Sequence, residues 1–253
     1  MVIGHCALAL GAKRFAPGVS LGTLLLAAVL ADLLWPLLVL VGAESFQIRI
    51  GATAAMPLEF ISYPYSHSLI ALTFVAVVFC AVRAIVSRTT GQALLVVGTL
   101  VISHWVLDVV AHGPDMPLAP AGDGRFGLGL WNSVPATLLV EGALVAGGVF
   151  LYATTTAPQN RAGSLGLWAL VAVLGAAFAA LIFGPVPQSH GVVLAATGSL
   201  WIVVLWGYWV DRNRSLSQRR DMRAPPTSAS NASARPHVRR KRAPSHAGGR
   251  SRI

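Results

Sequence analysis

Long apolar stretches, separated by short polar segments, make up most of the chain. A helix needs roughly 20 mostly apolar residues to cross the hydrocarbon core of a bilayer. Six segments reach that length, at residues 18–42, 67–87, 92–112, 131–153, 164–184 and 190–210. Residues 1–12 are also apolar but too short to cross, so we expect a surface helix or a re-entrant helix there. The pattern predicts an all-α, polytopic membrane bundle of about six transmembrane helices.

Composition fits a membrane environment and separates the chain into two parts. Only 11% of the residues are charged, and the mean hydropathy is +0.67, whereas soluble proteins carry about 25% charged residues. Residues 211–253 hold 12 of the 19 Lys and Arg but two of the nine Asp and Glu, so the whole net charge of +10 lies there. A segment this polar cannot bury enough apolar surface to fold alone. We therefore predict a membrane bundle over residues 1–210 and a basic, disordered tail over residues 211–253.

The distribution of basic residues orients the predicted bundle, because short cytoplasmic loops are enriched in Lys and Arg. The basic residues that flank the predicted spans on one side are Lys13, Arg14, Arg83, Arg88 and Arg161, and the tail follows on the same side. The longer loops 43–66 and 113–130 lie opposite and carry most of the acidic loop residues. We expect both termini to be cytoplasmic. The tail is expected to contact anionic lipid, and nucleic acid is the less favoured partner.

Three carboxylates fall within the predicted spans, at Asp32, Asp108 and Glu141. Each costs on the order of 2.5–3.5 kcal/mol at the centre of a transmembrane helix. One such group often serves only to hydrogen-bond neighbouring helices, but three in one chain favour a functional site. Glu141 has three open roles, as a ligand, as a partner of a histidine, or as a general base.

The predicted span 92–112 carries His104, Asp108 and His112 at intervals of four residues. This spacing places the three side chains along one stripe of a helix. Imidazole and carboxylate groups are ligands that suit zinc and similar divalent ions, and a proton relay would use the same groups. Three ligands on one helix rarely close a coordination sphere, so we expect other helices to contribute.

Further polar residues lie near the same depth. His67 begins the second span, either as a ligand or as an interfacial histidine flanked by serines. Asp32 lies four residues before Pro36, which lacks the N–H that would bond the Asp32 carbonyl. This feature either lines a polar cavity or marks a packing kink. The predicted topology puts His5 on the inner side, so His5 joins the others only if residues 1–12 re-enter the membrane.

These residues carry a resemblance to a known family. His5, Asp32, Tyr65-Ser66-His67-Ser68 and the segment from Ser103-His104 to Asp108, followed by His112-Gly113-Pro114, resemble the membrane-bound, metal-dependent hydrolase family. That family is a bacterial inner-membrane group near the zinc-dependent phospholipase C and single-strand nuclease clan. The resemblance covers residues 1–150 and implies zinc-dependent hydrolysis of a phosphoester, including lipid phosphoesters. Asp32 is a single acid where many relatives carry two, so the resemblance does not extend to a full multinuclear site.

The leading hypothesis is a membrane-embedded hydrolase that binds a divalent metal, zinc above others, and acts on a small-molecule or lipid substrate. The candidate metal ligands are His67, His104, Asp108, His112 and His5, and the candidate catalytic carboxylates are Asp32 and Glu141. One alternative is a proton- or cation-coupled transporter or channel that uses the three intramembrane carboxylates. A second alternative is a non-catalytic membrane scaffold. The sequence contains no Gly-rich phosphate loop, nucleophile elbow or Cys-x-x-Cys pair that would favour other chemistry.

Overall fold

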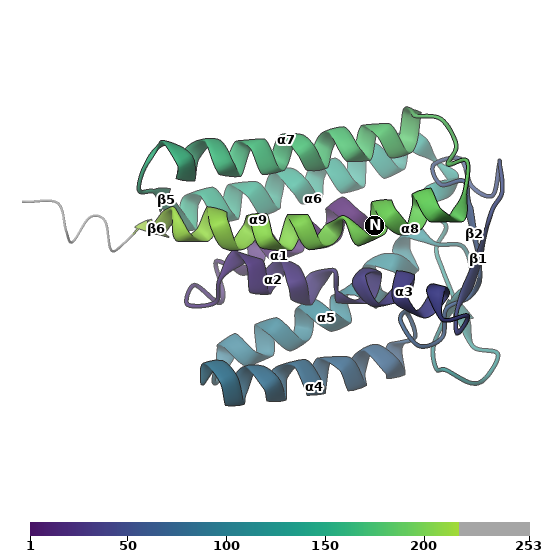
Figure 1. Ribbon diagram of the computed structural model, residues 1–253, viewed down its shortest axis with the longest axis horizontal. Coiled ribbons are helices and arrows are strands. Elements are labelled where there is room, and N and C mark those ends of the chain that lie inside the picture. Colours follow the sequence, from purple (N-terminus) through teal and green to yellow (C-terminus); the bar gives the residue numbers. More distant parts are fainter. Residues whose placement is uncertain (218–253) are drawn as a thin grey trace, which may run out of the picture.

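The computed structural model describes residues 1–217, and over that range the chain is mostly helical (Figure 1). Five helical segments are long and apolar enough to cross a membrane. They are α4 (Leu69–Ser87), α5 (Gln92–Ala111), α6 (Val134–Thr155), α7 (Arg161–Phe183) and the pair α8 (His190–Gly198) and α9 (Leu200–Arg212). A sixth span is formed by α2 (Leu21–Ala28) and α3 (Leu30–Leu40) if this bent pair counts as one. The prediction of about six apolar spans is therefore confirmed.

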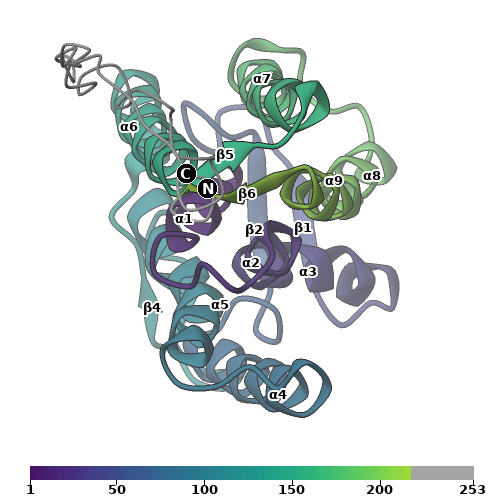
Figure 2. The ribbon, with the colours of Figure 1, turned by 90° about the vertical axis from the view of Figure 1, so that its left-hand side faces the viewer.

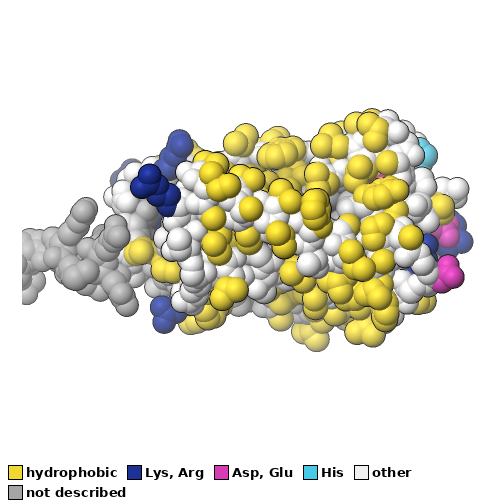
Figure 3. Space-filling model, turned by 90° about the horizontal axis from the view of Figure 1, so that it is seen from below, with side chains coloured by type: hydrophobic (Ala, Val, Ile, Leu, Met, Phe, Trp, Pro, Cys, Tyr) yellow, Lys and Arg dark blue, Asp and Glu magenta, His cyan; other side chains and the backbone are white. Residues whose placement is uncertain are grey.

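The surface of the bundle is apolar along its length. Hydrophobic side chains cover much of the face seen in Figure 3. On different helices of the bundle, Phe74 on α4, Leu139 on α6 and Phe183 on α7 each expose about seven-tenths of their surface. A soluble monomer rarely exposes apolar patches this extensive, whereas lipid-facing helices do so routinely. The outer surface is that expected of a membrane protein.

The first helix, α1 (Val2–Ala12), lies inside the bundle, and nine of its eleven residues are buried. It packs mainly against α6 and α2 and also contacts α5. Viewed from one end, the short helices α1 and α2 occupy the middle, and the long helices lie around them (Figure 2). The expectation of a surface helix is wrong, and the interior position is the one that the re-entrant alternative requires. The physical reason is that α1 is apolar on every side, so it gains from being enclosed by other helices.

The path of α1 depends on close contact with α6. Gly148 of α6 packs so tightly that an added Cβ atom would clash with the carbonyl oxygen of Ala7. Small residues let helix backbones approach each other in this way. The contact sets the depth of α1, and with it the position of His5.

The sequence predicts a backbone irregularity at Pro36, but the structure has its break at Val29 instead. The axes of α2 and α3 meet at 52° across Val29, whereas Pro36 is accommodated within α3. At the break, the carbonyl oxygen of Ala28 lies 2.8 Å from Nδ1 of His104. Irregular backbone at membrane depth is tolerated where it meets polar groups of the protein, and His104 provides one here.

Short antiparallel ribbons close both ends of the bundle. One end carries the pairs β1 (Ser45–Ile48) with β2 (Leu58–Ser62) and β3 (Met116–Pro117) with β4 (Arg125–Phe126), and the 3-10 helix η1 (Leu130–Asn132). The other end carries β5 (Thr156–Pro158) with β6 (Arg214–Leu216). The fold is thus helical with small strands, not purely α. Residues 211–217, predicted as tail, end α9 and form β6, while residues 218–253 lie outside the described part of the chain.

Candidate metal centre

Five of the predicted site residues converge near one end of the bundle. They come from α1, α3, the segment before α4, and α5, and they are His5, Asp32, His67, His104 and Asp108. They form two overlapping groups that share His104, and within each group the ligand atoms lie within 4.8 Å of one another. All are buried except Asp32, whose side chain is 15% exposed.

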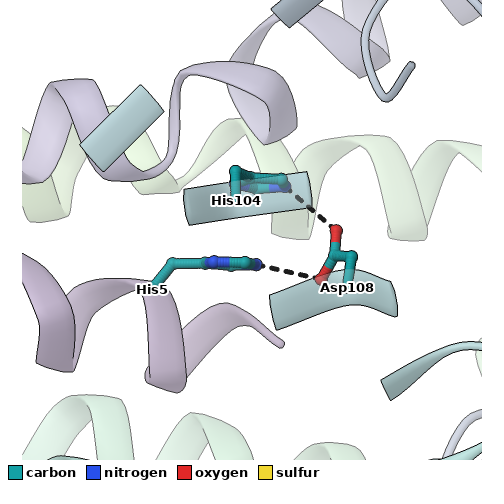
Figure 4. Close-up of side chains that lie close together, drawn as sticks. All are labelled: His5, His104 and Asp108. Carbon is teal, nitrogen blue, oxygen red and sulfur yellow. Dashed lines mark hydrogen bonds and ion pairs between the residues drawn. The ribbon is translucent and has the colours of Figure 1, made fainter. Parts of the chain in front are cut away.

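Asp108 lies at the centre of the first group. Its Oδ1 atom is 3.1 Å from Nε2 of His5 and 2.8 Å from the amino group of Met1. Its Oδ2 atom is 3.1 Å from Nε2 of His104. The rings of His5 and His104 stack with centroids 3.7 Å apart, and both point toward the Asp108 carboxylate (Figure 4). Because His5 belongs to α1, this group exists only because α1 enters the bundle.

The second group brings Asp32 and His67 to the same point. Nε2 of His67 lies 3.7 Å from Oδ1 of Asp32 and 3.8 Å from Oδ2 of Asp108. Nε2 of His104 lies 3.8 Å from Oδ1 of Asp32. Between the Nε2 atoms of His67 and His104 and these two carboxylate oxygens, the four nitrogen–oxygen separations therefore span 3.1–3.8 Å. Ligand atoms bound at 2.0–2.2 Å to a tetrahedral zinc ion are about 3.3–3.6 Å apart, and each of the four separations differs from that spacing by no more than about 0.2 Å.

The hydrogen bonds of the two rings indicate which nitrogen carries the proton. A carbonyl oxygen only accepts, so Nδ1 of His104 donates to Ala28 at 2.8 Å. The hydroxyl of Ser66 donates to the Glu44 carboxylate at 2.6 Å, and it therefore accepts from Nδ1 of His67, also at 2.6 Å. Assigned in this way, both neutral rings present the lone pair of Nε2 to the carboxylates.

This arrangement places acceptors opposite acceptors. When both rings are neutral, two imidazole lone pairs and two carboxylate oxygens face each other, and such a set repels itself unless a proton or a metal cation lies between its members. Nε2 of His104 and Oδ2 of Asp32, the second oxygen of that carboxylate, are buried and have no hydrogen-bond partner among the described residues. The donor set of two imidazoles and two carboxylates suits zinc, and a bound ion would satisfy these atoms.

Glu44 supports the site, although no pattern in the sequence singles it out. It is buried, and its Oε1 accepts from the backbone N–H groups of Tyr65 and Ser66 at 2.8 Å. A carboxylate that orients a metal-binding histidine through a hydrogen bond is a recurrent support for metal sites. Glu59, which lies on β2 within the same predicted loop 43–66, pairs with Arg49 at 3.0 Å on the surface. Sequence alone does not distinguish these two glutamates, because the difference arises from the fold.

His112 is the predicted ligand that the structure places elsewhere. Helix α5 ends at Ala111, and His112 adopts an extended conformation, so the stripe of His104 and Asp108 does not continue to it. Its ring packs on Trp131 with centroids 4.4 Å apart, and its Nδ1 lies 3.2 Å from Asp115. The two groups of potential ligands in the described chain do not include it.

Glu141 approaches the site from α6. It is buried, and its Oε2 accepts from the backbone N–H of Gly4, one residue before His5, at 3.2 Å. It is absent from both ligand groups, so the structure favours a neighbouring role over a ligand role. Its bond to α1 also helps to hold His5 at the site.

Comparisons of the chain with protein-family models, with curated proteins and with solved structures gave no match.

Proposed function

We propose that the chain is a membrane-embedded, zinc-dependent hydrolase that acts on a phosphoester or related ester of a lipid-like substrate. The observation that carries the proposal is the buried set of two imidazole Nε2 atoms and two carboxylate oxygens, with nitrogen–oxygen separations of 3.1–3.8 Å. The residues that would hold the ion are Asp32, His67, His104 and Asp108, with His5 as a further ligand. The resemblance of residues 1–150 to the membrane-bound, metal-dependent hydrolase family agrees with this proposal.

A bound zinc ion supplies a Lewis acid that lowers the pKa of a coordinated water to about 7. The protein supplies position and proton handling. Asp32 is the one partly exposed carboxylate of the set, so water and substrate approach from its side. Glu141, next to α1 and outside the ligand groups, is available to take or return a proton.

We further propose that the protein resides in a bacterial inner membrane with the site facing outward and both termini cytoplasmic. The distribution of charged side chains supports this orientation. Several Lys and Arg side chains lie at the end that carries β5 and β6, where no acidic side chain is visible in Figure 3, while the acidic side chains in that view lie at the opposite end together with other basic ones. The site lies on the acidic side, below the β1–β2 ribbon, since His67 lies between β2 and α4. By the positive-inside tendency this side faces outward.

The decisive experiment is elemental analysis of the detergent-purified protein, paired with hydrolysis of a chromogenic phosphodiester. We expect about one zinc per chain, and a loss of at least about tenfold in bound zinc and in hydrolysis for His104→Ala. His112→Ala is the matched control, because this histidine lies on the same helix end but outside the cluster. It should keep its zinc.

Other outcomes would favour the alternatives. A protein without stoichiometric metal that conducts protons or cations in liposomes would overturn the hydrolase and support the transporter. Retention of zinc in His104→Ala would show that the ion binds elsewhere. A protein without metal, hydrolysis or ion flux would support the scaffold.

A further inference from the structure

An apolar groove of about 490 Å³ runs along the outside of the bundle between α5 and α6, and α1 contributes to its lining. It is lined by small and aliphatic residues from all three helices, including Leu8, Thr99, Leu144, Gly147 and Leu151. These are the helices that carry His5, His104 and Glu141. The groove thus shares its walls with the candidate metal centre.

Small residues on α1 and α6 make room for the groove, which leucines and Phe15 also line. Gly148 brings α6 close to Ala7 of α1, which places the two helix backbones in contact beneath the groove. The adjacent Gly147 faces open space, since an added Cβ atom there would meet nothing within 4 Å. A side chain added at Gly147 would therefore extend into the groove.

The groove continues the faces of α1 and α6 that carry site residues. On α1, the lining residue Leu8 follows His5 by three positions. On α6, Leu144 follows Glu141 by three, and Gly148 follows it by seven. Residues at these spacings share one face of a helix. A molecule that lies in the groove therefore points one end toward the level of His5 and Glu141.

The third wall, α5, shows the same continuity. Leu100 lines the groove one turn before His104, and Ser103 lines it directly beside His104. From Leu95 to Ser103, the wall extends over about 12 Å of helix at 1.5 Å per residue. The groove accordingly runs from the level of His104 toward the end of the bundle that carries β5 and β6, since Leu95 lies in the first turn of α5.

We propose that this groove seats one hydrocarbon chain of a membrane lipid whose ester group is presented to the metal centre. The inference rests on the proposed hydrolase function and gives its substrate class as a membrane lipid. The occupant follows from position: the groove is apolar, opens sideways at span depth where lipid chains are the surrounding medium, and ends beside polar ligands. A lipid that enters with its headgroup at the level of the site would place its acyl chain in the groove and its ester group at the metal centre without further movement.

The test uses the full chain in vesicles that contain phosphatidylglycerol with a photoactivatable diazirine in one acyl chain. Cross-linked peptides are quantified by mass spectrometry for the wild type, Gly147→Leu and Gly142→Leu. Gly142 is the matched control because it lies on the same helix, is also exposed, and has no atom within 4 Å of an added Cβ, but does not line the groove. Thr99→Phe fills the groove from α5 and serves as a second variant. Zinc content is measured for every protein.

We expect cross-links to concentrate on groove residues of α1, α5 and α6 over the lipid-facing surface of α4. Gly147→Leu and Thr99→Phe should lower groove cross-linking by about tenfold, whereas Gly142→Leu should not change it, and all should keep zinc. Equal labelling of α4 and the groove, or labelling that survives both filling variants, would overturn the groove proposal. Groove labelling in a protein that binds no zinc would instead refute the hydrolase and leave the lipid site intact.

Discussion

His67 owes its orientation to a relay of two residues that do not contact the other ligands. Glu44 accepts a hydrogen bond from the Ser66 hydroxyl, and Ser66 accepts one from Nδ1 of His67. The relay fixes the tautomer of the ring and directs Nε2 toward Asp32 and Asp108. The proposed zinc affinity therefore depends on residues outside the ligand set.

Replacement of Ser66 by Ala should weaken zinc binding by about 10- to 100-fold, because His67 loses the acceptor for its Nδ1 proton. A chelator competition titration on the purified protein measures the change. Ser68→Ala is the matched control: Ser68 is equally buried, but its hydroxyl caps α4 by accepting from Ala71. That control should cost about 1 kcal/mol of stability and leave zinc affinity unchanged. Equal zinc affinity in the two variants would show that the relay does not support His67.

At the scale of elements, the position of α1 decides the composition of the site. This short helix brings His5 to Asp108 and provides the Gly4 N–H that holds Glu141. It also lines the proposed lipid groove. Its depth depends on the close approach to α6 at Gly148, so a change at that one contact should affect all three features.

Gly148→Ala should destabilise the protein by about 1–3 kcal/mol, because the new Cβ atom would clash with the Ala7 carbonyl, and α1 must shift. We expect a lower thermal unfolding midpoint in detergent together with weaker zinc binding. Gly147→Ala is the control on the adjacent residue, where the added atom meets open space. This control should be neutral or slightly stabilising. Unchanged zinc binding in a destabilised Gly148→Ala would separate α1 from the metal centre.

At the scale of the whole molecule, a polar cluster links several helices at the end of the bundle opposite the site. Lys13 of the segment after α1 pairs with Asp211 of α9 at 2.8 Å, and Asp211 also accepts from Tyr152 of α6 at 3.1 Å. Arg214 of β6 donates to Thr156 and Gly163, which joins α9 to α6 and α7. Burial lowers the pKa of Arg214. This cluster lies at the end predicted to be cytoplasmic.

The proposed orientation is testable by labelling with a membrane-impermeant maleimide in intact cells. In a background with Cys80→Ala, Ile50→Cys in the β1–β2 loop should be labelled from outside, because Ile50 is 82% exposed. Thr90→Cys, between α4 and α5, should react only after permeabilisation. The remaining Cys6 is fully buried. The reverse labelling pattern would place the metal centre on the cytoplasmic side.

Sequence alone was sufficient for the spans and for most of the side chains that meet at the site. Hydropathy over 20 residues and spacing along one helix are local properties, so the spans, the shared face of His104 and Asp108, and the cost of Asp32 in lipid can be read from the chain. The end of α5 at Ala111 takes His112 off that face. This helix end is also a local feature, but the sequence does not mark it, because the residues around Ala111 would fit a helix equally well.

Only the tertiary structure decided which helix faces meet. The entry of α1 into the bundle, the recruitment of Glu44 over Glu59, and the groove beside Gly147 all depend on contacts between residues far apart in the chain. Hydropathy records how much of a segment avoids water, but it does not record which neighbour covers it. Close packing of small residues and the pairing of buried polar groups select that neighbour, and both require the folded molecule.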